Sequence, residues 1–247
     1  MMRNFKLILS YDGTGFTGWQ TQPGFRTVQE TLETAVMRVT GETNLRVFAS
    51  GRTDAGVHAV GQVVHFHSDM QVPFWKLLGA FNAHLPDDIV VHSVEEVPVE
   101  FDATRDAIRK QYRYVIHDGP TASPFMRRYA CRSKVRLDAA AMARAAVPLK
   151  GTHDFHSFET EWPNRASSVR TITHLAVSRA GDYIWIDVEA DGFLYNMVRA
   201  IAGTLMNVGR GYWPESKVAE ILAAKDRVQG GPTAPAEGLF LMRVTYE

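Results

Sequence analysis

The feature that most constrains the fold of this chain is a short loop bracketed by two glycines, Gly51 and Gly56. An apolar stretch at 45–48 precedes the loop and an alternating stretch at 62–67 follows it, and both patterns are typical of β-strands. Glycine lets the backbone turn sharply and approach a neighbouring group closely. The sequence therefore predicts a tight loop between two strands, at the rim of a sheet.

Two charged side chains lie inside this loop, Arg52 and Asp54. An arginine at a sheet rim can bind an anion or a planar group, and an aspartate can act as nucleophile, as base or as charge partner. Taken alone, the string also fits a hairpin loop in which the aspartate caps its own backbone. The loop by itself leaves both interpretations open.

Hydrophobic periodicity predicts a mixture of strands and helices along the whole chain. We expect strands at 5–11, 45–51, 61–67, 89–97, 110–117, 171–178, 183–190 and 239–246, and helices at 28–39, 74–83, 138–146, 194–209 and 214–224. The strands at 171–178 and 183–190 form a hairpin. Antiparallel pairing with helices gathered on one face indicates an α+β fold.

Three helix ends carry recognisable signals. Thr27 and Glu30 have the spacing of a capping box, in which each side chain bonds to the backbone amide of the other residue. Asp138 is the predicted N-cap of the helix that follows it. Gly209 is expected to end the helix that precedes it.

Motifs in a fixed order run along almost the whole chain. They lie at residues 11–20, 27–29, 51–59, 110–114, 151–155, 169–172, 193–199, 234–235 and 238–239. Together they resemble the tRNA pseudouridine synthase A family from end to end. The chain departs from some relatives at Tyr195 and Asn196, where those relatives carry histidines.

The resemblance implies an isomerase that converts uridine to pseudouridine at positions 38, 39 and 40 of the tRNA anticodon stem-loop, without a cofactor. It implies two similar α+β domains with antiparallel sheets, at 1–104 and 105–247. These domains would be related by a pseudo-two-fold axis, with the active cleft between them. The resemblance also implies a homodimer that binds the anticodon arm of tRNA.

The resemblance also assigns roles to site residues. Asp54 is the essential carboxylate, which attacks C1′, adds to the base or removes a sugar proton. Arg199 is expected to keep Asp54 ionised, because a nearby cation offsets the effect of burial on a carboxylate. Tyr112 is expected to stack on the flipped uracil, and its hydroxyl group is expected to take part in transfer of the C5 proton. Arg52 and Leu239 are the remaining predicted contacts of the substrate nucleotide.

The charge distribution along the chain supports an RNA partner, although the total charge does not. The chain has 27 basic and 27 acidic residues, yet residues 105–136 hold nine basic and two acidic ones. Such polarisation can present a basic surface on a neutral protein, although a solvated face would give the same pattern. The predicted contacts of the tRNA backbone are Arg105, Arg109, Lys110, Arg127 and Arg128.

Composition limits the setting in which the chain works. Cys131 is the only cysteine in the sequence, so no disulfide can form within the chain, and a reducing, cytoplasmic compartment is expected. No signal peptide and no membrane helix are expected, because no apolar run is long enough. We expect no metal either, because His58, His65 and His67 have no Cys or Glu close by in the sequence.

Two other functions remain as alternatives. A glycoside hydrolase also attacks C1′, but it needs a second carboxyl group, for which Asp12 is the only candidate within a motif. A tRNA-binding chaperone without turnover would use the same basic surface. Intact Asp54 and Tyr112 favour the enzyme over the chaperone.

Overall fold

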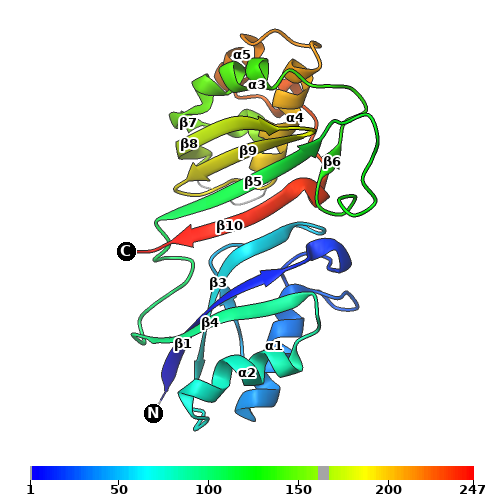
Figure 1. The fold of residues 1–247 in the computed structure, drawn as a ribbon. Coiled ribbons are helices and arrows are strands. Elements are labelled where there is room, and N and C mark those ends of the chain that lie inside the picture. Colours follow the sequence, from blue (N-terminus) through cyan, green and yellow to red (C-terminus); the bar gives the residue numbers. More distant parts are fainter. Residues whose placement is uncertain (1, 161–166) are drawn as a thin grey trace. The chain divides into compact units, whose positions relative to one another are not determined.

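The computed structural model describes residues 2–160 and 167–247, and it is an α+β protein with two compact units (Figure 1). Unit 1 comprises Met1–Ile108 with Leu241–Glu247, and unit 2 comprises Arg109–Phe240. The division at 108/109 lies close to the expected boundary at 104/105. The last residues differ from the expected assignment because they pack in unit 1, where Tyr246 donates a hydrogen bond to the Ala103 carbonyl at 2.7 Å.

Unit 1 is an antiparallel sheet covered by two helices. Its elements are β1 (Arg3–Tyr11), α1 (Val28–Thr40), β2 (Phe48–Ala49), β3 (His58–Ser68), α2 (Phe74–His84) and β4 (Ile89–Val97). The strand order is β4-β1-β3, with β2 and the C-terminal β10 (Leu239–Thr245) also beside β3. The predicted strand at 45–51 is shorter than expected, because only two of its residues pair with β3.

Helix α1 has the predicted apolar face, but the predicted capping box is wrong. Thr27 is the N-cap residue, yet its side chain makes no capping hydrogen bond. The amides of the first turn have other partners, since Val28 donates to the Gly18 carbonyl at 3.2 Å and Gln29 to the Trp19 carbonyl at 3.0 Å. Backbone carbonyls of the preceding segment therefore replace the side-chain cap.

Unit 2 also contains antiparallel strands, together with three α-helices. Its elements are β5 (Arg109–His117), β6 (Cys131–Arg132), α3 (Ala139–Ala146), β7 (Gly151–Asp154), β8 (Val169–Ala180), β9 (Tyr183–Ala190), α4 (Met197–Gly209) and α5 (Lys217–Ala224). The strand order is β5-β9-β8-β7, and the short β6 runs parallel to β5. The predicted β8–β9 hairpin is confirmed, and Asp138 caps α3 by accepting from the Ala141 amide at 2.9 Å.

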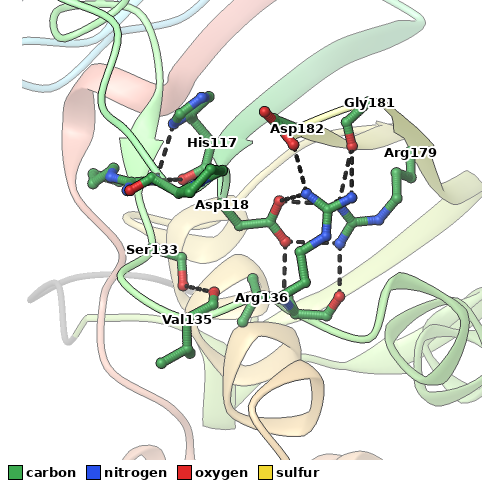
Figure 2. A network of polar contacts seen from close by, with 11 residues as sticks. His117, Asp118, Ser133, Val135, Arg136, Arg179, Gly181 and Asp182 are labelled. Atoms are coloured by element: carbon green, nitrogen blue, oxygen red, sulfur yellow. Dashed lines mark hydrogen bonds and ion pairs between the residues drawn. The ribbon is translucent and has the colours of Figure 1, made fainter.

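A buried carboxylate joins three segments of unit 2 at the end of β5 (Figure 2). Asp118, whose side chain is 0% exposed, accepts two hydrogen bonds from Arg179 at 2.7 and 2.9 Å. Arg136 donates a third at 3.1 Å, and the Leu137 amide a fourth at 2.9 Å. Burial alone would raise the pKa of Asp118, but the hydrogen bonds and the two guanidinium charges hold it below its usual value.

We predict that Asp118→Asn lowers the free energy of unfolding at neutral pH by roughly 3–5 kcal/mol, because it removes the buried charge that pairs with the half-buried guanidinium group of Arg179. Since the pKa of Asp118 is depressed on folding, its stabilising effect is present above the pKa of an unfolded aspartate, ~3.9, and is lost as the pH falls further. Urea unfolding between pH 7 and pH 3 measures both effects.

The matched control for this prediction is Glu215→Gln, which removes an exposed ion pair with Arg144 in the same unit. It should leave the midpoint of unfolding almost unchanged. Equal destabilisation by both substitutions would contradict the assignment of Asp118 as the buried centre of this network.

Candidate active site

The loop between β2 and β3 presents Asp54 on a firmly held backbone. The hydroxyl groups of Tyr11 and Thr53 form a buried hydrogen bond of 2.8 Å, and the Trp19 amide donates to the Thr53 carbonyl at 3.0 Å. The Val57 amide closes a turn on the Asp54 carbonyl at 3.1 Å. Asp54 itself is half-buried, so a fixed loop presents a carboxylate that is still accessible to solvent.

Two glycines of the preceding segment make this close packing possible. A Cβ atom on Gly13 would lie 2.0 Å from the Val57 carbonyl oxygen. Gly18 has a φ of +84°, and a Cβ atom there would lie 2.9 Å from the Thr53 carbonyl oxygen. Both clashes involve backbone atoms, which cannot move aside as a flexible side chain can. The motif at 11–20 therefore acts as the support of the Asp54 loop.

Asp12 and His58 form contacts with the segment that supports the Asp54 loop. The Gly13 amide donates to Nδ1 of His58 at 3.0 Å, and a carboxylate oxygen of Asp12 lies 3.2 Å from that nitrogen. The backbone amide and the hydroxyl of Thr14 donate to Asp12 at 3.0 and 2.6 Å. Asp12 therefore has structural partners on both sides, in Thr14 and His58.

A buried Gln62–Ser50 pair was not expected from the sequence, because neither residue lies in a recognisable pattern. Gln62 is fully buried in β3 and donates to the Gly51 carbonyl at 2.9 Å, while the Ser50 hydroxyl donates to its amide oxygen at 2.8 Å. These bonds hold the first half of the loop. Arg52, between the two fixed halves, is exposed.

The predicted residues of unit 2 lie on two different elements. Tyr112 is on β5 opposite Val188 of β9. Its ring makes an edge-to-face contact with the ring of Phe193, with ring centres 5.0 Å apart. Tyr112 is 8% exposed and Leu239, the first residue of β10, is 6% exposed. Unit 2 therefore holds the ring of Tyr112 in a fixed orientation.

Arg199 is the third residue of α4 and is half-buried. Its Nε atom donates to the Ala234 carbonyl at 2.7 Å, and Nη1 donates to Oδ1 of Asn196 at 2.8 Å. The Ala234 amide donates back to the Arg199 carbonyl at 3.1 Å. The guanidinium group is therefore oriented from within unit 2. Asp54 and Arg52 belong to unit 1, so their meeting with Arg199 and Tyr112 stays a prediction.

The predicted RNA-contacting cations differ in their contacts within the protein. Arg105 forms an ion pair with Asp106 at 2.8 Å, and Arg109 lies 3.6 Å from Glu189. Arg127 donates to the Pro124 carbonyl at 2.7 Å, and both it and Arg128 are exposed. Lys110 is half-buried, and burial together with the charge of Arg170 lowers its pKa. The four arginines of the predicted set are therefore exposed, whereas Lys110 is half-buried.

The remaining histidines of β3 also have local roles. Nδ1 of His65 accepts from the Ala103 amide at 3.0 Å, and burial lowers the pKa of this imidazole. Nε2 of His67 contacts the Val99 carbonyl at 3.1 Å. Across residues 2–160 and 167–247, no group of three or more His, Cys, Asp or Glu side chains has an arrangement suited to a metal ion. In the same part of the chain, no helix is long and apolar enough to span a membrane.

Comparison with known proteins decides the family. The sequence pattern of a family described as tRNA pseudouridine synthase matches residues 7–104 and 145–247. The chain belongs to the tRNA pseudouridine synthase family. The matched residues include Asp54 and Arg199, whereas Tyr112 lies in the interval between the two matched segments.

Relatives of this family cover that interval as well. The chain is 47% identical to the tRNA pseudouridine synthase A of Brevibacillus brevis, over 99% of this chain and all of that protein. It is 45% identical to the protein of the same name from Ruminiclostridium cellulolyticum, over 99% and 100% of the two chains. The family resemblance expected from the motifs is therefore confirmed along the whole chain.

A solved structure is also similar, but only distantly. A Cbf5-Nop10-Gar1 complex matches with a TM-score of 0.33 and 9% identity, over 81% of this chain and 54% of that one. A likeness of this size does not establish a shared fold.

We predict that Tyr11→Phe slows turnover and destabilises the Asp54 loop, because it leaves the Thr53 hydroxyl buried without its partner, at a cost of about 1–3 kcal/mol. Burial raises the pKa of Tyr11 to about 12, so this hydroxyl stays protonated at every pH suitable for the assay. Hydrogen exchange at the loop amides and the rate of pseudouridine formation measure the two effects.

The control is a double-mutant cycle with Thr53→Val, which removes the other hydroxyl at nearly constant volume. The two substitutions together should cost less than the sum of their separate effects, because neither partner is then left unsatisfied. Strict additivity would show that the hydrogen bond does not hold the loop.

Proposed function

We propose that this protein is a tRNA pseudouridine synthase that converts uridine to pseudouridine at positions 38, 39 and 40 of the tRNA anticodon stem-loop, with Asp54 as the essential carboxylate. The observation that carries the proposal is the Asp54 loop of unit 1. In a chain of this family, it holds a half-buried carboxylate on a backbone fixed through Thr53.

The reaction detaches uracil from C1′, turns the base and joins it to the sugar again through C5. It exchanges no electrons with a cofactor, so a small number of protein groups is sufficient. These groups are a carboxylate near C1′, a surface that receives the base, and a means of moving the C5 proton. Asp54 is the proposed carboxylate, whether it attacks C1′, adds to the base or removes a sugar proton.

Tyr112 is the proposed surface for the base, with its hydroxyl group near C5. Stacking of a nucleobase on an aromatic ring stabilises a complex by about 1–3 kcal/mol. The contact with Phe193 supports this role, because a ring held at a fixed angle loses little freedom when a base stacks on it. Leu239 is the proposed apolar neighbour of the same base.

Arg199 is the proposed charge partner of Asp54. A cation close to a carboxylate favours the ionised form, which both a nucleophile and a base require. The two contacts that orient Arg199 within unit 2 support this role, since a guanidinium group with a fixed plane can form a bidentate pair.

RNA recognition is assigned to basic residues between positions 105 and 128. Arg105, Arg109, Lys110, Arg127 and Arg128 are the proposed contacts of the tRNA backbone. Arg52 is proposed to support the extruded nucleotide, because flipping a base costs a few kcal/mol and is easier where a stem meets a loop. The protein is further proposed to act as a cytoplasmic homodimer, a state that analytical ultracentrifugation would test.

We predict that the protein releases tritium from tRNA transcripts labelled at uridine C5, because formation of the new carbon–carbon bond expels the C5 hydrogen. Asp54→Asn should abolish the release while tRNA binding persists. The matched control is Asp69→Asn, which removes an equally negative but exposed carboxylate at the end of β3 and should leave the rate unchanged.

Wild-type protein that binds tRNA but releases no tritium would favour the chaperone without turnover. Release that persists in Asp54→Asn would leave the synthase intact and remove Asp54 from its proposed role. The same assay on transcripts with single labelled positions assigns the reaction to positions 38, 39 or 40.

We predict that Arg127→Gln and Arg128→Gln each weaken binding to all tRNAs and reduce the slope of log affinity against log salt by about one. Each substitution removes one cation that would displace a counterion from the RNA backbone. Arg38→Gln, on the exposed side of α1, is the control and should not alter the slope. Filter binding between 50 and 300 mM salt measures the slopes. Slopes equal to that of the wild type would exclude this surface.

A further inference from the structure

The side chain of Asn196 contributes to the orientation of Arg199, together with a backbone carbonyl of unit 2. Nε donates to the Ala234 carbonyl, and Nη1 donates to the amide oxygen of Asn196 at 2.8 Å. The two acceptors contact different nitrogens of the guanidinium group. Together they fix both the place and the plane of the group, which a single hydrogen bond could not do.

The Ala234 side of this arrangement is backbone that the fold holds tightly. The Gly231 amide donates to the Thr204 hydroxyl at 3.0 Å, so the segment that leads to Ala234 lies directly on α4. A Cβ atom on Gly203 would lie 1.8 Å from the Pro232 carbonyl oxygen, which shows how closely the two backbones approach. Asn196 is therefore the only one of the two acceptors that a substitution can remove.

The backbone of Asn196 has a conformation that is uncommon for residues other than glycine. Its φ of 62° and ψ of 6° place it in the left-handed region, which asparagine tolerates better than most residues. It occupies the N-cap position of α4, yet its side chain does not cap the helix amides. The side-chain oxygen of an asparagine N-cap normally accepts a hydrogen bond from those amides, whereas here it accepts one from the Arg199 side chain.

The other end of the Asn196 amide is also engaged. Its Nδ2 atom donates to the Thr160 hydroxyl at 3.0 Å, and the Thr160 amide donates to the Tyr195 carbonyl at 3.0 Å. A flipped amide would direct its NH2 group at the guanidinium group, which has no acceptor. The hydrogen-bond network therefore fixes the amide with its oxygen toward Arg199.

We infer that Asn196 is a positioning residue for the reaction, which holds the Arg199 guanidinium group in the orientation needed to act on the reacting carboxylate. This inference rests on the proposed function, in which Arg199 keeps Asp54 ionised. Local backbone strain at a residue whose side chain orients a charged group is consistent with a functional constraint.

The test is Asn196→Gly, compared with Lys225→Gly. Both positions have positive φ, 62° and 49°, and glycine fits this conformation, so neither substitution should strain the backbone. Lys225 ends α5 and makes an exposed ion pair with Asp154 at 3.4 Å, so it controls for the backbone effect.

We expect Asn196→Gly to lower kcat roughly 10- to 100-fold with little change in KM for tRNA, because misplacement of a catalytic group by about 1 Å costs this much. The acidic limb of the kcat profile should move to higher pH, as it should in Arg199→Lys, since the carboxylate then has a poorly placed cation. Lys225→Gly should match the wild type in rate and profile. In Arg199→Lys, adding Asn196→Gly should have little further effect.

The possible outcomes separate this inference from the proposed function. Wild-type kcat and pH profile in Asn196→Gly, with Arg199→Lys impaired, would overturn the positioning role alone. Wild-type behaviour of Arg199→Lys would remove the role of Arg199 and the inference with it, while the Asp54 assay would still test the synthase. Equal losses in Asn196→Gly and Lys225→Gly would assign the effect to the backbone and overturn the inference.

Discussion

The close approach of two backbone segments in unit 1 is the constraint on which the proposed site depends. Gly13 and Gly18 allow the segment after β1 to touch the Asp54 loop without intervening side chains. The same segment supplies carbonyl groups to the first amides of α1 and an amide to the Thr53 carbonyl. One stretch of chain thus starts a helix and fixes a loop. This double use explains why α1 needs no side-chain cap.

In unit 2 a close approach of two backbone segments also holds a proposed site residue. There a glycine of α4, Gly203, receives the backbone of the segment that ends at Ala234, and that segment orients Arg199. In both units glycines allow an irregular segment to lie close to neighbouring backbone, and a proposed site residue, Asp54 or Arg199, lies next to that contact. Rigid backbone around a reactive group reduces the cost of organising it for each turnover.

Charge has separate structural and functional uses in this protein. The buried carboxylate of Asp118, with Arg136 and Arg179, joins the end of β5 to the β8–β9 hairpin, and it engages one of the nine basic residues of the 105–136 region, Arg136. Ion pairs also engage Arg105 and Arg109. A count of charges along the sequence cannot reveal such ion pairs. The acidic partner lies either far away in the sequence or directly next to the basic residue.

The sequence by itself determined the family, the α+β class and most strands and helices, and it predicted the central residues of the site. Periodicity located these elements because burial imposes it locally, and the ordered motifs identified Asp54, Tyr112 and Arg199 as candidates. Only the tertiary structure decided how those residues are held. The Tyr11–Thr53 bond, the Gln62 contact with the loop and the Asn196 cradle join residues whose pairing depends on the folded path of the chain. The missing capping box has the same cause, since carbonyl groups of the preceding segment accept from the first amides of α1 while the Thr27 side chain makes no capping hydrogen bond.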